Sequence, residues 1–339
     1  MLEDYVMRIA ISINGQGRGH LTRMTALGQI LSLEHELIFW CPEKYHSELA
    51  EAFPESFIFP IPYYQFVLDG PKIDIIKTSL VNVEHLIGLP VYTSDLVDQL
   101  HLMDIDLVIS DFEPFLPKAA RKIGLPIIQL NHPAVVLRSL SFSPDALIAK
   151  VISTSMMGEY DIKIISSFYN GDIGPIIRKE ITSAMPRQGD YYIVYLYHTM
   201  RDTVLEELDS IPGIKFRSFP NPDEDFVEAL AGCRGVITNA GHQLLSEALH
   251  LKKPVLSIPM EGQYEQKLNA EMLVHSGQGR MGSIEHIRDN LPAFFHFVEQ
   301  QFDPSKTPKL SNIKFRLRDD AASAVSLLNY HICKQKAVS

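Results

Sequence analysis

The sequence predicts an α/β protein made of two doubly wound domains, each a parallel sheet with helices on both faces. Three observations support this prediction. The chain has 339 residues, more than one hydrophobic core normally organises, so two domains of about 150 residues are expected. Short apolar runs alternate with helical segments in both halves, as in parallel sheets with crossover helices. In each half a glycine-containing loop directly follows an apolar run.

The first half contains five short apolar runs that we expect to form buried strands, with helices between most of them. They cover residues 7–13, 36–40, 57–59, 107–110 and 127–130. A helix over residues 145–160 and a strand over residues 162–165 follow, so the first domain is assigned to residues 1–168. Residues 63–104 are the least regular part, because prolines interrupt their apolar patches.

The second half repeats the alternation of strands and helices. Strands are expected at residues 191–197, 214–219, 236–238 and 255–258, and helices at residues 203–209, 223–231 and 242–251. The second domain is assigned to residues 191–318, after a linker over residues 169–190. Residues 319–339 are expected to contain a final helix.

The first apolar run leads into the loop NGQGRGH, residues 14–20, and then into a helix predicted over residues 21–33. A strand, a glycine loop and a helix in this order form a turn that can face a ligand. Gly15, Gly17 and Gly19 lack the spacing of the dinucleotide fingerprint, and no acidic residue follows the second strand at the expected place. The loop therefore argues against NAD binding.

A second glycine loop lies in the second half. The run GVITN, residues 235–239, precedes Gly241, and a helix is expected to begin near His242. The free N–H groups of its first turn and the helix dipole suit a diphosphate. Glu247 is expected on the polar side of this helix, where a carboxylate can accept two ribose hydroxyl hydrogens. The acidic and amide-rich run 261–269 follows the next strand, at the edge where doubly wound sheets bind ligands.

These residues resemble the C-terminal half of the GT-B glycosyltransferases, particularly the UDP-sugar-dependent glucosyl and glucuronosyl transferases and the peptidoglycan GlcNAc transferase. The positions that match the plant signature of this group are Gly241, Glu247, Ala248, Pro259, Glu265, Gln266, Asn269 and Ala270. Asn239 stands in place of the signature histidine, and Gln243 replaces its asparagine. Two extra residues separate Pro259 from Glu265.

The resemblance implies two Rossmann-like doubly wound domains that face each other across a cleft, with the final helix packing back on the first domain. It implies an inverting, metal-independent transfer from a nucleotide sugar, with UDP as the expected nucleotide, to a hydroxyl of a small-molecule, glycan or lipid acceptor. The nucleotide sugar is a substrate, so no cofactor is expected. Residues expected to bind the donor are Gly17, Gly19, Asn239, Gly241, His242, Gln243, Glu247, Glu265 and Gln266.

The loop that ends in Gly19 and His20 resembles the first loop of the same enzymes, in which the histidine is the general base. His20 inherits that role, and Asp111, at the end of the apolar run 106–112, matches the carboxylate that orients it. Simpler roles stay open at this point. His20 can satisfy a loop carbonyl, and Asp111 can cap the helix expected over residues 115–123.

Other simple roles concern the donor residues and two arginines. Glu247 can be a solvated helix residue, and Glu265 and Gln266 can be polar residues at a helix start. Arg18 and Arg23 can hold an anion or form surface ion pairs.

Two other functions also stay open. The spacing of Gly19, His20 and Arg23 resembles that of flagellin-sugar hydrolases, in which the histidine activates water. A nucleotide-sugar hydrolase or epimerase on the same two domains is therefore the nearest alternative. A non-catalytic nucleotide-sugar-binding protein is the second.

Composition limits the partners. The net charge of −10 argues against nucleic-acid binding. Cys41, Cys233 and Cys333 are widely spaced and are expected to be reduced thiols. The chain has no leader of signal type and no run of about 18 apolar residues, so a cytoplasmic location is expected. A peripheral membrane contact stays open.

Overall fold

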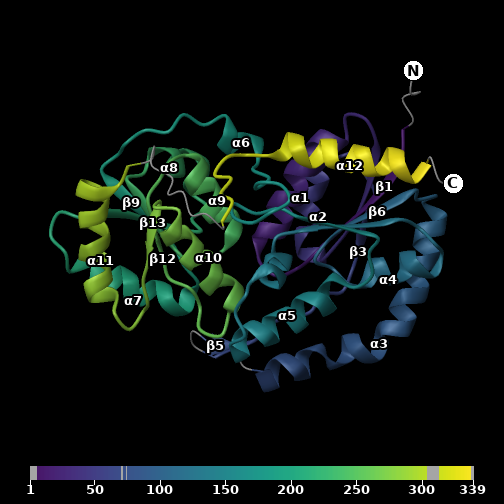
Figure 1. Ribbon diagram of the computed structural model, residues 1–339, viewed down its shortest axis with the longest axis horizontal. Helices are drawn as coiled ribbons and strands as arrows, with labels where there is room; N and C mark the ends of the chain where they lie inside the picture. The colour runs from purple at the N-terminus through teal and green to yellow at the C-terminus, as the bar shows by residue number, and fades with distance from the viewer. Residues whose placement is uncertain (1–5, 70–71, 74, 304–312, 337–339) are drawn as a thin grey trace.

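The computed structural model describes residues 6–69, 72–73, 75–303 and 313–336. It contains two doubly wound α/β domains side by side, as predicted (Figure 1). Parts of the segments assigned to residues 1–168, 191–318 and 319–339 lie outside the described residues, as does the side chain of Cys333. Cys41 and Cys233 are buried and unpaired.

The first domain is built on a six-stranded sheet in the order β3-β2-β1-β6-β7-β8. All of its pairings are parallel. The strands are β1 (Arg8–Ile13), β2 (Glu36–Cys41), β3 (Ile58–Pro60), β6 (Leu107–Asp111), β7 (Ile127–Asn131) and β8 (Ile162–Ile165). Its helices are α1 (Arg18–Leu31), α2 (His46–Ala52), α3 (Ile75–Leu102), α4 (Phe115–Lys122) and α5 (Pro144–Met157), with 3₁₀ turns η1 (Glu43–Tyr45) and η2 (Pro133–Arg138). The central strands β6 and β7 are buried along their whole length, which explains their continuous apolar runs.

The second domain is built on a five-stranded parallel sheet in the order β10-β9-β11-β12-β13. The strands are β9 (Tyr191–Tyr195), β10 (Lys215–Phe219), β11 (Gly235–Thr238), β12 (Val255–Ser257) and β13 (Gly279–Met281). The helices are α7 (His198–Asp209), α8 (Phe226–Gly232), α9 (His242–His250), α10 (Tyr264–His275) and α11 (Ile287–His296), which continues into the π-helical turn η3 (Phe297–Gln301). The short helix α6 (Lys179–Thr182) lies between the two sheets in the sequence.

The strand orders determine where a ligand can bind. The order of the first sheet reverses between β1 and β6, and that of the second sheet between β9 and β11. Doubly wound sheets bind ligands at the carboxyl ends of the strands at such a reversal. In the first domain the loop that begins at Asn14 follows β1, and Asp111 ends β6. In the second domain Gly241 follows β11.

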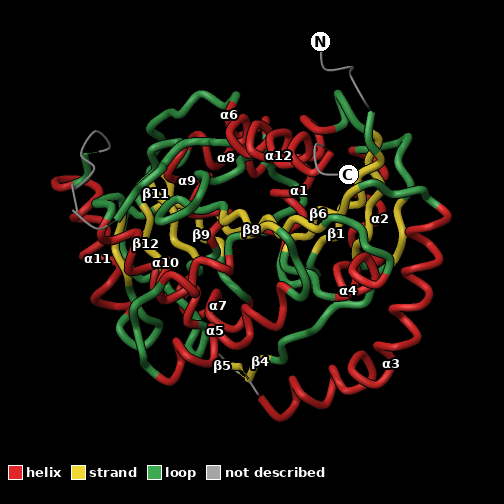
Figure 2. The backbone as a smooth tube through the Cα atoms, turned by 45° about the vertical axis from the view of Figure 1, so that its right-hand side comes forward, coloured by secondary structure: helices red, strands yellow, loops and turns green. Residues whose placement is uncertain are grey.

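Most of residues 63–104, the least regular region in the sequence, forms one long helix, α3. Helix α3 has 28 residues and runs along the outer edge of the first domain (Figure 2). It contains Pro90, and interior prolines usually break helices because they remove a backbone hydrogen bond. The short antiparallel pair β4 (Leu68–Asp69) and β5 (Lys72–Ile73) precedes it.

The last helix, α12 (Ala321–Lys336), returns from the second domain and packs against α1 of the first domain (Figure 1). Four of its side chains, Ala321, Ala324, Leu328 and Ile332, belong to the same buried cluster as the β1 and α1 side chains. Helix α12 is therefore part of the core of the first domain, although it follows the second domain in the sequence. No helix in the described ranges is both long and apolar enough to span a bilayer.

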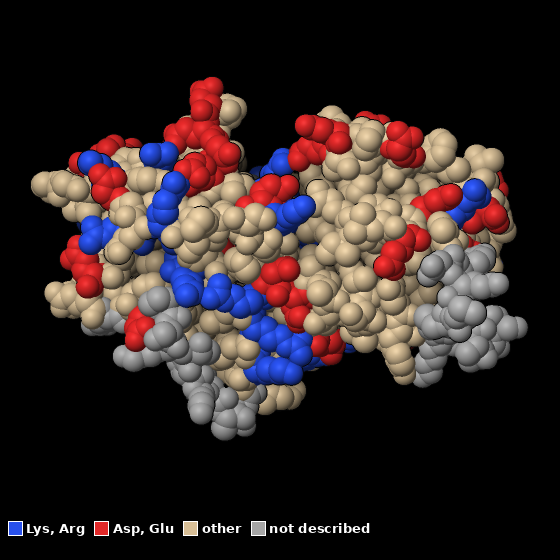
Figure 3. Space-filling view, turned by 90° about the horizontal axis from the view of Figure 1, so that it is seen from above, with Lys and Arg blue, Asp and Glu red and all other residues tan. Residues whose placement is uncertain are grey.

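The surface seen from above carries both signs of charge. Lys and Arg side chains form a band on one part of this face, while acidic side chains are spread over both domains (Figure 3). The net charge of −10 therefore does not produce a uniformly acidic face here.

We expect Leu328→Ala to lower the free energy of unfolding by about 3 kcal/mol, because it removes a fully buried side chain and leaves a cavity beside α1. Urea unfolding followed by circular dichroism measures this change. Tyr330→Ala is the matched control, because Tyr330 lies on the same helix with 60% of its surface exposed. An equal loss in both variants would show that α12 is not docked through Leu328.

Candidate active site

The first glycine loop is held in a defined shape. Gly17 precedes α1 with φ of 71°, a backbone conformation that favours glycine. The hydroxyl of Tyr45 donates to the carbonyl of Gly17 at 2.8 Å, and Lys44 Nζ donates to the carbonyl of Gly15 at 2.7 Å. Helix α1 begins at Arg18 instead of residue 21, so His20 lies in its first turn.

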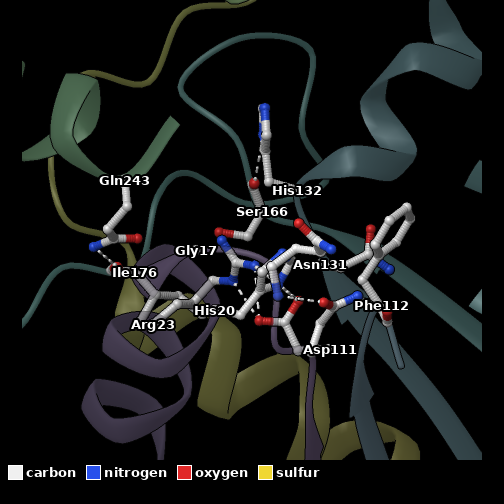
Figure 4. A network of polar contacts seen from close by, with 12 residues as sticks. Gly17, His20, Arg23, Asp111, Phe112, Asn131, His132, Ser166, Ile176 and Gln243 are labelled. Carbon is white, nitrogen blue, oxygen red and sulfur yellow. Dashed lines mark hydrogen bonds and ion pairs between the residues drawn. The ribbon is translucent and has the colours of Figure 1, made fainter. Parts of the chain in front are cut away.

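His20, Arg23 and Asp111 form a buried cluster at the reversal of the first sheet (Figure 4). His20 Nδ1 lies 2.9 Å from Asp111 Oδ1. Arg23 Nη2 donates to both carboxylate oxygens at 2.7 Å, and its Nε donates to Oδ2 at 3.1 Å. Asp111 is completely buried, and Arg23 and His20 are only 3% and 9% exposed. The structure thus brings the two predicted catalytic residues into direct contact.

The pKa of Asp111 lies below its ordinary value. Burial opposes ionisation of this carboxyl group, but its electrostatic interactions and hydrogen bonds with Arg23 and His20 outweigh the burial. Asp111 is therefore an anion that can compensate a charge on His20.

Arg23 is a site residue whose role was left open in the sequence. His20 and Arg23 are three residues apart on α1, a spacing that places both side chains on one helix face. That spacing was the available signal, but it did not identify Asp111 as their common partner. Arg18 instead pairs with Glu48 at the surface.

Asp111 does not cap α4. The carboxylate of Glu113 accepts hydrogen bonds from the N–H groups of Phe115 and Leu116 at 2.5 and 3.0 Å. Burial raises the pKa of Glu113 to about 7, against the opposing effect of these hydrogen bonds. The carboxylate of Asp111 is directed to α1, and the following residue, Phe112, turns the chain with φ of 58°.

The second glycine loop lies against the first. Gly241 is the N-terminal flanking residue of α9 and is exposed, and α9 has no side-chain cap within the described residues. A Cβ on Gly19 would lie 3.3 Å from Cβ of Gln243, so the first turns of α1 and α9 touch. The two loops that were predicted to share one site are therefore neighbours.

The polar side of α9 faces the segment that leaves the first domain. Glu247 accepts two hydrogen bonds at 3.0 Å from the guanidinium of Arg178, and Gln243 Nε2 donates to the carbonyl of Ile176 at 3.2 Å. Glu247 is 2% exposed, so its interpretation as a solvated helix residue is wrong. Its predicted contact with a ribose stays a prediction.

Two further donor candidates hold loops of their own domain. Asn239 Oδ1 accepts from the N–H of Tyr197 at 2.8 Å, and its Nδ2 donates to the carbonyl of Ile258 at 3.0 Å. Asn239 thus joins the ends of β9, β11 and β12 at the second reversal. Gln266 Oε1 accepts from the N–H of Met260 at 2.9 Å, which closes the loop before α10.

Glu265 lies at the start of α10 and points towards the first domain. Its Oε1 is 3.6 Å from His132 Nε2, and 34% of its side chain is exposed. Burial raises the pKa of Glu265, while the charges of His20 and Arg23 partly oppose that increase. Glu265 is therefore electrostatically coupled to the His20 cluster across the domain junction.

A stacked pair of histidines crosses the same junction. The rings of His132, after β7, and His242, at the start of α9, lie 3.6 Å apart between centroids with an interplanar angle of 12°. His132 Nε2 contacts Asn269 Oδ1 at 3.0 Å, and the Tyr169 hydroxyl donates to the same oxygen at 2.6 Å. The N–H of Phe168 donates to His242 Nε2 at 3.2 Å. These contacts join positions far apart in the sequence, so periodicity offered no signal for them.

Both stacked histidines are neutral near pH 7. Burial lowers the pKa of His132 to about 3, and the charge of Arg23 adds to this effect. Burial also lowers the pKa of His242 well below its ordinary value, with smaller contributions from His132 and Arg23. Because the unfolded chain accepts protons on these groups near pH 6.5, acid favours unfolding.

We expect the free energy of unfolding to fall as the pH drops from 6.5 towards 3, by up to about 1.4 kcal/mol per pH unit for each buried histidine. His132→Gln removes one of these groups and should make the decline shallower. Urea unfolding at several pH values measures both slopes. His275→Gln, at the exposed end of α10, is the control and should retain the wild-type slope. Equal slopes in all three proteins would contradict the assignment.

Comparison with known proteins agrees with this geometry. The profile of glycosyl transferase family 1 matches residues 7–299. A glycosyltransferase of Methanosarcina mazei is 24% identical over 336 residues, which cover 81% of this chain and 85% of the relative.

Solved structures share the fold. The glycosyltransferase of kitacinnamycin superposes with a TM-score of 0.64 at 16% identity, over 96% of this chain and 99% of that one. UGT2 of Phytolacca americana superposes with a TM-score of 0.60 at 14% identity, over 88% and 91% of the two chains. These similarities confirm the predicted GT-B fold of two Rossmann-like domains. The chain therefore belongs to glycosyl transferase family 1 and is a glycosyltransferase.

Proposed function

We propose that this glycosyltransferase transfers a sugar from a UDP sugar to an acceptor hydroxyl, with inversion at the anomeric carbon and without a metal ion. The observation that carries the proposal is the 2.9 Å contact of His20 Nδ1 with Asp111 Oδ1, next to the uncapped start of α9. A base and an anion-binding helix terminus at one junction suit a displacement between an alcohol and a diphosphate ester.

His20 is the proposed general base. When Nδ1–H donates to Asp111, the lone pair of Nε2 is free to accept the hydroxyl proton of the acceptor. The acceptor oxygen then bonds to the anomeric carbon, and the bond from that carbon to the phosphate oxygen breaks. The electron pair leaves with UDP, and Asp111 compensates the charge of the imidazolium. Both oxygens of Asp111 are already hydrogen-bonded, which argues against attack by this carboxylate and favours direct displacement with inversion.

The donor is proposed to lie at the start of α9. Gly241 is exposed, so the diphosphate can approach the first N–H groups of the helix closely. These groups and the helix dipole stabilise the negative charge of the leaving UDP, which is the task a metal ion performs elsewhere. UDP is favoured because the structure of Phytolacca UGT2 contains UDP-2fluoro-glucose. Glu247, whose carboxylate is held by Arg178, is the proposed contact of the ribose.

The acceptor is proposed to enter a cavity of about 550 Å³ in the first domain. The cavity lies between α3 and the segments after β2 and β3, and Pro42, Lys44, Ile61, Tyr63, Tyr92 and Leu96 are among its lining residues. Lys44 also holds the glycine loop through the carbonyl of Gly15, so this wall adjoins the loop that carries His20. Its apolar and aromatic side chains suit a hydroxylated apolar acceptor.

His20→Ala should reduce turnover of a UDP sugar by about 100-fold or more and leave donor affinity almost unchanged, because only the base is lost. Glu247→Ala should instead weaken donor binding by about tenfold or more, because charged hydrogen bonds to the ribose are removed. Calorimetry with UDP and UDP sugars, and UDP release in the presence of acceptors, measure the two effects.

Asp209→Ala, at the exposed end of α7, is the matched carboxylate control, and thermal unfolding verifies that each variant is folded. Equal losses of donor affinity in His20→Ala and Glu247→Ala would contradict the roles assigned to these two residues. Rapid release of free sugar without any acceptor would favour the hydrolase alternative.

Asp95→Trp should block the acceptor cavity. Asp95 is an exposed cavity-lining residue of α3, so an indole there fills the cavity without disturbing the core. With phenols and medium-chain alcohols as acceptors and a saturating UDP sugar, KM for the acceptor should rise about tenfold or more, with donor affinity unchanged. Asp98→Trp, one helical turn away and outside the lining, is the control. A normal acceptor KM in Asp95→Trp would place the acceptor elsewhere.

A further inference from the structure

Arg23 contacts both members of the proposed catalytic pair. Its Nη2 lies 2.7 Å from each oxygen of Asp111 and 3.1 Å from His20 Nδ1. The proposed role of His20 as the base places the ring hydrogen on Nδ1, where it is donated to Asp111, so the approach of Arg23 to the imidazole brings two donors together. The shared carboxylate holds them in this arrangement, with the permanent charge of Arg23 beside the ring.

We propose that Arg23 is a positioning residue that locks Asp111 against His20 and lowers the pH range in which His20 accepts a proton. This inference rests on the proposed role of His20 as the base. The hydrolase and transferase reactions both require such a base, so the inference applies to either.

The locking follows from the geometry of the guanidinium. A buried carboxylate with one partner can rotate about its Cβ–Cγ bond, and His20 would then lose its orienting acceptor. Arg23 donates to both oxygens in a rigid fork, which fixes the plane of the carboxylate. Oδ1 is thereby directed at Nδ1, and Nε2 stays free of hydrogen.

The effect on protonation follows from charge. A carboxylate alone beside a histidine stabilises the imidazolium. The ring then stays protonated up to a higher pH, and a protonated ring cannot act as a base. The fixed positive charge of Arg23 opposes a second positive charge on His20 and offsets part of that stabilisation.

Three other described groups near His20, Phe112, His132 and Glu265, add no positive charge near pH 7. The ring of Phe112 is stacked on His20 at 6.1 Å between centroids. His132 is neutral because burial lowers its pKa to about 3. Glu265, on α10, is a further titratable group coupled to His20, and its charge acts in the same direction as that of Asp111. Among these described neighbours, Arg23 is the cation that counters the two carboxylates.

The test separates charge from geometry. Arg23→Gln keeps hydrogen-bond donors without the charge, whereas Arg23→Lys keeps the charge without the fork. The imidazole of His20 is titrated by NMR in the substrate-free protein, with its resonance assigned by its loss in His20→Gln. We expect the midpoint to rise by about one pH unit in Arg23→Gln and to stay close to wild type in Arg23→Lys. The acid limb of kcat/KM should move in the same way.

Arg121→Gln is the control, because it removes an arginine that pairs with Asp161 at 2.8 Å on the surface of α4. The His20 titration midpoint and the pH profile of kcat/KM in Arg121→Gln should equal those of the wild type. An unchanged midpoint in a folded Arg23→Gln protein would overturn the proposal and leave Arg23 as a structural partner of Asp111.

If Arg23→Gln does not fold, Arg23→Lys decides the outcome. Loss of the fork should lower kcat about tenfold with an unmoved acid limb, and a wild-type kcat would overturn the proposal. The two inferences fail separately. If the His20 midpoint shifts in Arg23→Gln but the wild-type protein does not turn over a UDP sugar, the role of Arg23 is supported and the proposed function is refuted. If the wild type turns over normally but the midpoint does not shift, the proposed function is supported and the role of Arg23 is refuted.

Discussion

The site depends on one buried carboxylate. Asp111 has no exposed surface, and an unpaired charge in such a place is very costly, so a cation and hydrogen-bond donors must lie against it. Arg23 and His20 meet this requirement from one face of α1. The requirement fixes how α1 sits over the ends of β1 and β6, and therefore where the free nitrogen of His20 points. The glycine loop before α1 supplies the turn that makes this approach feasible.

The junction between the domains extends from the same cluster. The close approach of Gly19 to Gln243 brings the start of α9 beside α1, and the stack of His132 on His242 holds that approach. Polar groups buried at this junction find partners across it, as Asn269 does with His132. The base and the helix terminus proposed for the diphosphate are thus held in one relative position, which favours a reaction between two substrates.

Strand positions were predictable because a buried parallel strand leaves a continuous apolar run. The runs that contain β1, β6 and β11 were identified in this way, and each leads into or ends at a part of the site. The long helix α3 was not identified, since Pro90 argues locally against a helix and tertiary packing overrode that preference. The roles of the candidate donor-binding residues were harder to predict. Gln266 matches the signature and Asn239 stands in place of its histidine, yet the side chains of both residues hold the loops of the second domain together.

The sequence by itself determined the fold class, the two glycine loops and the candidates His20, Asp111 and Glu247. The fold class and the glycine loops depend on local patterns, since periodicity and glycine placement are set within a few residues, whereas the roles of His20 and Asp111 were implied by the resemblance to GT-B enzymes. Only the tertiary structure decided the partners. Asp111 meets Arg23 across 88 positions, Glu247 meets Arg178 across 69, and His132 meets Asn269 across 137. The physical reason is that a buried polar group takes whichever partner the packing of sheets and helices brings within hydrogen-bond distance, and local sequence carries no record of that choice.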